Sequence, residues 1–205
     1  MHEFDSTAFN RDAWEERWRA RGAAPAPPPN PYLTAAAAEL PPGAALDAGC
    51  GAGAEALHLA AAGWQVTAVD LSAEALALAG RSAVGHPAAD RVEWIRADLA
   101  TWDPESRFDL VTTHYAHPAM PHGEFYDRLA SWVAPGGTLL IVGHLASPPG
   151  QGHRHPEAAS TTAAAVVDRL DGAQWTIETA AEPVRTVAGH AAELHDVVVR
   201  AVRHR

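Results

Sequence analysis

Residues 44–55 read Ala-Ala-Leu-Asp-Ala-Gly-Cys-Gly-Ala-Gly-Ala-Glu, and they predict a buried strand, a glycine-rich turn and the start of a helix. Gly49, Gly51 and Gly53 let the backbone turn sharply and approach a ligand, because no Cβ atom stands in the way. The helix that follows offers free N–H groups and the positive end of its dipole. The stretch therefore predicts a ligand site at a strand–helix junction.

Asp70 follows a second apolar strand, which is expected over residues 64–69. A carboxylate at that place can accept hydrogen bonds from the two hydroxyls of a ribose, so the ligand is expected to contain a nucleoside. Two kinds of cofactor fit the glycine turn. Residues 49–54 satisfy the dinucleotide fingerprint G-x-G-x-x-G/A. With Asp47 they also satisfy a second pattern, D-x-G-x-G-x-G.

The composition bounds the possible partners. The chain of 205 residues suits one domain with a large core, since 47% of the residues are apolar and 20% are charged. A formal net charge of −10 argues against nucleic acid or an anionic membrane as the main partner. Cys50 is the only cysteine, so no disulfide within the chain is possible. No signal peptide or membrane span is recognisable, and we expect a cytoplasmic protein.

The first 43 residues predict a helical arm that belongs to the same domain as the rest of the chain. One helix is expected over 12–21, with Trp14 and Trp18 on the same face, and another over 32–40. The proline-rich residues 24–31 between them cannot be helical and should run extended.

We expect residues 11–33 to act as a lid, with Trp14, Trp18 and Tyr32 facing the bound ligands. The alternative is a static brace that does not move. A simpler interpretation of the two indoles is that they dock on the core of the domain.

From residue 44 to residue 205 strands alternate with helices, which predicts a parallel sheet covered on both faces. After the strand that opens at residue 44, further strands are expected over 64–69, 91–96, 108–113, 138–143, 175–179 and 195–202. The expected helices cover 54–62, 73–82 with Ser72 as N-cap, 123–133 and 161–170. Residues 147–155 predict a loop, and the stretch between 181 and 193 should be irregular with a turn at Gly189.

Several of these motifs resemble those of class I S-adenosylmethionine (SAM)-dependent methyltransferases. Asp47 and the glycine turn resemble their first motif, and Asp98 follows the third strand, where these enzymes place an acid near the adenine. Phe108-Asp109-Leu110-Val111 resembles their fourth-strand motif, and Pro135-Gly136-Gly137 resembles the turn before their fifth strand.

Over residues 12–203 the chain is most similar to small bacterial methyltransferase-domain proteins grouped with tellurite-resistance and thiopurine-type enzymes. Their arm also carries a Trp-x-x-Arg-Tyr/Trp pattern, here residues 14–18, followed by Pro-Asn-Pro, here residues 29–31.

The resemblance implies a Rossmann-like, doubly wound α/β fold with a seven-stranded sheet of order 3-2-1-4-5-7-6 and an antiparallel last strand. It also implies SAM as cofactor and S-adenosylhomocysteine (SAH) as product, with the ribose on Asp70 and the adenine near Asp98 and Leu99. The residues expected to bind the cofactor are Asp47, Gly49, Cys50, Gly51, Gly53, Asp70, Leu71, Asp98, Leu99, His114 and Trp18.

Histidines gather after the expected fourth and fifth strands, at the edge of the sheet where an acceptor would meet the methyl group. We expect His114, His117 and His144 to include a catalytic base, whose titration near ~6.5 would make the rate fall at lower pH. Residues expected to bind the acceptor are Trp14, Tyr32, Tyr115 and His144. A polar rim without catalytic work is one alternative, and metal ligation by His114, His117 and His122 is another, although we expect no metal.

The expected function is SAM-dependent methyl transfer (EC 2.1.1.-) to a small-molecule nucleophile through oxygen, nitrogen, sulfur or a chalcogen. A non-catalytic SAM-binding sensor or scaffold is an alternative, and a nicotinamide-dependent oxidoreductase is a weaker one. The fold does not determine the acceptor atom, and the sequence indicates no oligomeric state.

Overall fold

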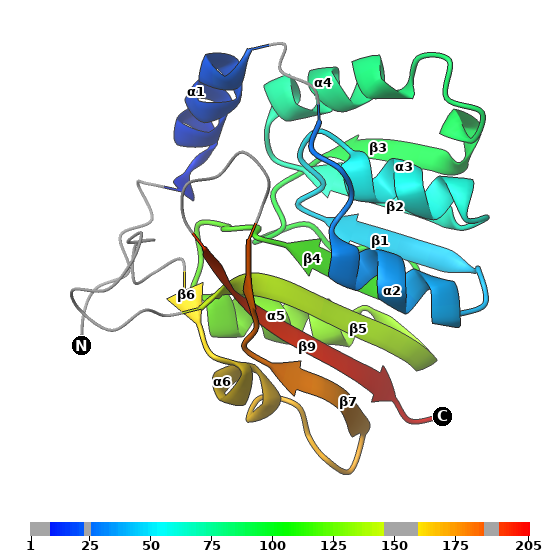
Figure 1. Ribbon diagram of the computed structural model, residues 1–205, viewed down its shortest axis with the longest axis vertical. Coiled ribbons are helices and arrows are strands. Elements are labelled where there is room, and N and C mark those ends of the chain that lie inside the picture. Colours follow the sequence, from blue (N-terminus) through cyan, green and yellow to red (C-terminus); the bar gives the residue numbers. More distant parts are fainter. Residues whose placement is uncertain (1–8, 23–25, 146–159, 187–192) are drawn as a thin grey trace.

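A computed structural model describes residues 9–22, 26–145, 160–186 and 193–205 (Figure 1). The expected loop at 147–155 and the expected turn at Gly189 lie outside these residues. Within the described residues, none of the helices has the length and apolar character that crossing a bilayer requires.

A central sheet runs through the molecule in the order β3-β2-β1-β4-β5-β9-β7 (Figure 1). Its strands are β1 (Ala44–Ala48), β2 (Gln65–Asp70), β3 (Val92–Arg96), β4 (Phe108–His114), β5 (Val133–Leu145), β7 (Trp175–Ala181) and β9 (Leu194–Arg203). The first five pair in parallel, whereas β9 is antiparallel to both of its neighbours. Counted along the chain this is the order 3-2-1-4-5-7-6, so the prediction of the sheet is confirmed.

Helices cover both faces of the sheet (Figure 1). These are α2 (Pro31–Glu39), α3 (Ala54–Ala61), α4 (Ala73–Ala83), α5 (His122–Ser131) and α6 (Ala163–Val167), with a 3₁₀ turn η2 (Ala89–Arg91) before β3. α1 (Arg11–Arg21) lies next to α4 instead (Figure 1). Ser72 caps α4 as predicted, because its hydroxyl oxygen accepts a hydrogen bond from the Ala75 amide at 3.1 Å.

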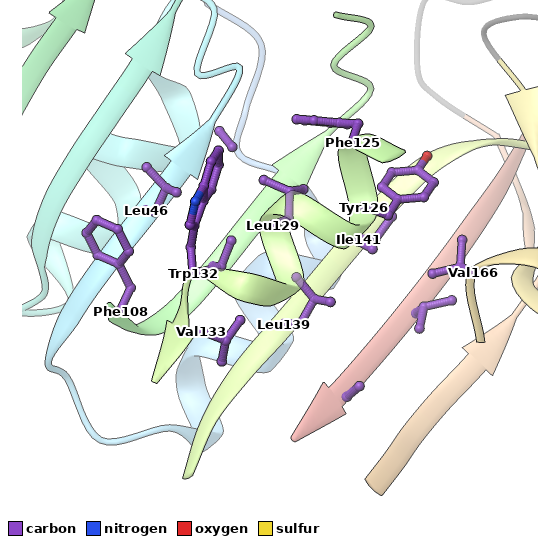
Figure 2. Close-up of a cluster of buried hydrophobic side chains, with 14 of the residues drawn as sticks. Leu46, Phe108, Phe125, Tyr126, Leu129, Trp132, Val133, Leu139, Ile141 and Val166 are labelled. Carbon is purple, nitrogen blue, oxygen red and sulfur yellow. The ribbon is translucent and has the colours of Figure 1, made fainter. Parts of the chain in front are cut away.

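The alternation of side chains along β5 divides the core into two clusters. Leu139 and Ile141 pack with Leu129 of α5, in the cluster that Figure 2 shows. Leu140 and Val142 point to the other face and pack with residues of α2 and α3. Each strand in the middle of the sheet is therefore buried on both faces, as its nearly continuous apolar sequence predicts.

Most predicted boundaries agree with the structure to within two residues, and the larger differences are these. β5 begins at Val133 rather than at 138, because Val133 pairs with Phe108 before the Pro-Gly-Gly turn shifts the register. α6 covers only 163–167 of the expected helix at 161–170. The stretch between 181 and 193 is not wholly irregular, because a short strand, β8 (Val184–Arg185), pairs with β9. Another short strand, β6 (Ser160–Thr161), pairs with β5.

The strand order reverses between β1 and β4, and this reversal positions the site. From β1 the chain continues to β2 on one side and later to β4 on the other, which opens a crevice beyond the carboxyl ends of the strands. Asp47, Asp70 and His114 lie at or next to those ends.

Candidate active site

The glycine turn between β1 and α3 adopts a conformation that other residues rarely take. Gly49, Gly51 and Gly53 have φ angles of +81°, +51° and +82°. A Cβ atom on Gly49 would lie 2.5 Å from the Cβ of Ala116, and one on Gly51 would lie 2.9 Å from the Trp18 ring. The turn therefore needs glycine both for its backbone angles and for the close approach of its neighbours.

Asp70 is tied to this turn at the end of β2. Its Oδ2 atom accepts a hydrogen bond from the Gly51 amide at 2.8 Å, and its Oδ1 atom accepts one from the Ser72 amide at 2.9 Å. Burial raises the pKa of Asp70, and these backbone hydrogen bonds oppose the rise. The carboxylate is thus held in one orientation, and each oxygen keeps acceptor capacity for a ligand.

A cavity of about 460 Å³ lies over the turn, within the size range of small-molecule sites. All the residues expected to bind the cofactor line it except Gly53, which caps α3 and whose Cα faces the Trp94 ring. Trp14, Tyr115 and His117 line it as well. Tyr32 and His144 are not among the described residues of its lining, and His144 stacks on the Tyr115 ring.

The cavity floor beside the glycine turn is acidic. Asp47 is 1% exposed, and its Oδ2 atom has no hydrogen-bond partner among the described residues. Burial raises the pKa of Asp47 well above its ordinary value, and the charges of Glu55 and Asp70 raise it further. Burial likewise raises the pKa of the Cys50 thiol. A cationic ligand group would compensate the buried carboxylates on this floor.

The arm is anchored beside the cavity by Glu15, a residue that the sequence analysis did not single out. Its carboxylate accepts hydrogen bonds from the Ser72 hydroxyl at 2.7 Å and from the Ala73 and Glu74 amides at 2.9 and 3.1 Å. Arg96 adds an ion pair at 3.0 Å. Desolvation raises the pKa of Glu15, but these hydrogen bonds and Arg96 outweigh it and lower the pKa to about 2.

The two indoles of the arm face the cavity. No residue of α1 is fully buried, and both Trp14 and Trp18 are partly exposed. The Trp14 Nε1 atom donates to the backbone carbonyl of His117 at 3.2 Å, and its ring stacks on the His117 imidazole. The indoles are therefore placed against the site rather than docked in the core, while their movement stays a prediction.

The histidines differ in their surroundings. The His114 Nε2 atom lies 3.3 Å from the Thr112 hydroxyl, and its Nδ1 atom is buried without a partner among the described residues. Burial lowers the pKa of His114 to about 3, so the ring is neutral at physiological pH and would be a very weak base. We therefore do not propose His114 as the catalytic base.

His117 belongs to a stack of aromatic rings at the other end of the cavity. Its Nδ1 atom lies 3.1 Å from Nε2 of His122, and its ring stacks on His144 at a centroid distance of 5.5 Å. Among the described residues, no group of three or more His, Cys, Asp or Glu side chains is arranged to hold a metal ion.

A polar cluster next to this stack consists of Tyr115, Arg185 and Asp196, and of these only Tyr115 was predicted from the sequence. Tyr115 donates a hydrogen bond to the fully buried Asp196 at 2.7 Å, and Arg185 pairs with Asp196 and donates to the Tyr115 hydroxyl. Asp196 is a charged residue next to the apolar run 197–199, which was a signal of a special role. Arg185 gave no such signal, because it lies in a stretch without periodicity.

Residues 45–137 match the family model of the methyltransferase domain. Trans-aconitate 2-methyltransferase of Streptomyces avermitilis is 35% identical over 126 residues, which are 57% of this chain and 46% of that protein. Probable thiol methyltransferase 2 of Arabidopsis thaliana is 29% identical over 136 residues, which are 63% of this chain and 60% of that protein. The chain therefore spans about half the length of these relatives.

Among solved structures, magnesium protoporphyrin IX methyltransferase of Synechocystis PCC 6803, crystallised with bound SAM, superposes with a TM-score of 0.67. The superposition covers 99% of both chains at 20% sequence identity, and it shows that the fold is shared. The matched domain, the sheet order and these relatives support a class I SAM-dependent methyltransferase.

Proposed function

We propose that the protein binds SAM in this cavity, transfers its methyl group to a small-molecule nucleophile and releases SAH. The observation that carries the proposal is the acidic floor, where Asp47 keeps a buried oxygen without a partner among the described residues. The ammonium and sulfonium groups of SAM are cationic and suit this floor. The pyrophosphate of a nicotinamide dinucleotide is anionic, and Asp47, Glu55 and Asp70 would repel it.

The residues that would hold SAM follow from the geometry of the cavity. Asp70 would accept the ribose hydroxyls, Asp47 would accept the ammonium group, and Asp98 and Leu99 would border the adenine. When bound, SAM supplies an electrophilic methyl group. The work of the protein is then to align the acceptor and to exclude water, and positioning of this kind can lower a barrier by ~7–11 kcal/mol.

The arm would close the cavity through α1 and residues 27–31, as part of the same domain. Glu15 fixes α1 to the amino end of α4, and Trp14 and Trp18 lie over the site, so the arm can shield it from water. The names of the relatives, which refer to trans-aconitate and to thiols, favour a small molecule as the acceptor.

For acceptors that carry a proton, we assign the role of general base to His117. It lines the cavity, and its Nδ1 atom lies within hydrogen-bond distance of His122, which can orient the ring. His117→Gln should lower kcat by ~10²-fold on a phenol or an amine and leave the affinity for SAH unchanged. Anionic nucleophiles such as a thiolate or a halide should lose much less. His58→Gln, on a helix outside the cavity lining, is the matched control.

Turnover tests the proposal as a whole. The protein would be incubated with methyl-labelled SAM and a panel of thiols, phenols, amines, carboxylates, and halide and chalcogen anions. We expect labelled product from at least one class of acceptor. SAM binding without product from any of them would favour a non-catalytic sensor or scaffold.

A further inference from the structure

Asp196 of β9 connects the acceptor end of the cavity to three other elements. It is fully buried, accepts a hydrogen bond from the Tyr115 hydroxyl at 2.7 Å and pairs with Nε of Arg185. The Tyr115 hydroxyl in turn accepts a hydrogen bond from Nη2 of Arg185 at 2.7 Å. Burial and the nearby Asp196 raise the pKa of Tyr32 of α2, and Arg185 opposes that rise. A buried carboxylate is costly unless it is paired. The cluster therefore fixes both Arg185 and Tyr115 in the wall of the cavity.

Arg185 keeps part of its guanidinium available to a ligand. It lines the cavity, and 24% of its side chain is exposed. Asp196 occupies Nε and Tyr115 occupies Nη2, and the Tyr32 hydroxyl also interacts with the guanidinium. A guanidinium carries five N–H donors in a planar fork, so donors remain after these contacts. Asp196 and Tyr115 therefore hold Arg185 in place, and its remaining N–H groups can donate to a ligand.

The charges of the cavity are separated along its length. Asp47, Glu55 and Asp70 lie at the end with the glycine turn, while Arg185 lies at the end formed by β8 and the residues after β4. The other arginine in the described lining is Arg21, which belongs to the arm. An anion in the cavity would be repelled from the first end, and at the second end the remaining N–H groups of Arg185 could donate hydrogen bonds to it.

The backbone of Tyr115 is strained in a way that fits a binding wall. Its φ angle is +55°, and it is the one non-glycine residue with positive φ in the described part of the chain. Such a conformation is unfavourable for a residue with a side chain and persists where the surroundings hold it, often at ligand sites. Here the Tyr115 amide donates to the Val142 carbonyl at 2.9 Å, and the ring stacks on His144 at 4.6 Å.

We propose that Arg185 determines the specificity for the methyl acceptor by binding a carboxylate that the acceptor carries. The inference rests on the proposed function, since it concerns the acceptor end of the same cavity. A carboxylate is planar and offers two oxygens, which match the geometry of the fork. The acceptor class is then small carboxylic acids, and their anionic group is drawn away from Asp47 and the other carboxylates.

Binding to the SAH-saturated protein tests this without turnover. Calorimetric titrations would compare benzoate with benzamide and succinate with succinamide. At least one acid should bind ~10-fold or more tightly than its amide, as expected for hydrogen bonds between charged groups. Arg185→Gln should abolish the preference, and Arg185→Lys should keep part of it because the charge remains.

Arg185→Gln leaves Asp196 buried without its counter-charge, so the double variant with Asp196→Asn is measured beside it. Arg200→Gln is the control, because Arg200 is an ion-paired arginine of β9 that lies outside the cavity lining. This variant should keep the preference for the acid over its amide. Equal binding of acids and amides, no binding of any acid, or a preference that survives Arg185→Gln would each overturn the inference. Failure of the wild-type protein to bind SAH would count against the proposed function instead.

Discussion

The two ends of the cavity are built in different ways. The end that would hold SAM is a local structure, in which the turn at 49–53 and Asp70 come from two consecutive β–α junctions. The acceptor end combines side chains from α1, β8, β9 and the segment after β4, which are far apart in the sequence. The backbone of a tight turn can bind a cofactor that many enzymes use. An acceptor, in contrast, is selected by side chains that several surface elements bring together.

Gly49→Ala should have the largest effect, because it changes the glycine turn at the place where the two ends of the cavity meet. The new Cβ would lie 2.5 Å from the Cβ of Ala116, on a residue with φ of +81°. Overpacking and a left-handed alanine together cost about 2–5 kcal/mol, so the affinity for SAH should fall by ~10²-fold or more.

Gly80→Ala is the control for that variant. Gly80 lies inside α4, and a Cβ there would meet nothing within 4 Å. The affinity for SAH should stay unchanged, and the free energy of unfolding should rise by ~0.4–1 kcal/mol. Tight SAH binding by Gly49→Ala would show that the turn does not need its glycine.

Asp47→Asn should separate the two ends, since it changes the acidic floor and leaves the acceptor wall intact. Losing a charged partner for the ammonium group should weaken SAH binding by ~10–100-fold. The free energy of unfolding of the ligand-free protein, in contrast, should rise. The folded pKa of Asp47 is raised, so the wild-type protein loses stability as the pH rises above about 3.8, because the unfolded carboxyl ionises at a lower pH than the folded one.

Asp47→Asn should remove that loss, which unfolding measurements between pH 4 and 8 would detect. If the variant bound SAH as tightly as the wild type, the acidic floor would not contact the ammonium group. A result in which both SAH affinity and stability fell would indicate a structural role for Asp47 instead.

The comparison also shows what the sequence could predict. The strand order, the glycine turn and Asp70 follow local rules of periodicity and turn chemistry, and their predicted places agree with the structure. Arg185 could not be found, because β8 is two residues long and exists through its pairing with β9. The low pKa of His114 was equally out of reach, since it comes from the burial of the ring and not from its place after β4.

Glu15→Gln should have the smallest effect, confined to the arm. The change removes a negative charge at the amino end of α4, where the interaction of a carboxylate with the helix dipole contributes ~0.3–1 kcal/mol. Amide exchange in α1 should therefore speed up by less than ~10-fold. Glu16→Gln, at an exposed neighbouring position, is the matched control.

The pH dependence gives a second check on this anchor. The folded pKa of Glu15 is depressed to about 2, so its stabilisation is complete above about pH 4.5 and is lost as the pH falls toward 2. Added SAH should slow amide exchange in α1 if the arm closes as a lid. Exchange that is the same with and without SAH would support the static brace.

The central claim is that this cavity binds SAM, and calorimetric titration of the wild-type protein with SAM, SAH and NAD tests it most directly. We expect SAM and SAH each to bind at one site per chain, and NAD to give no saturable heat, because its pyrophosphate would face Asp47, Glu55 and Asp70. Saturable binding of NAD with no binding of SAM or SAH would contradict the account.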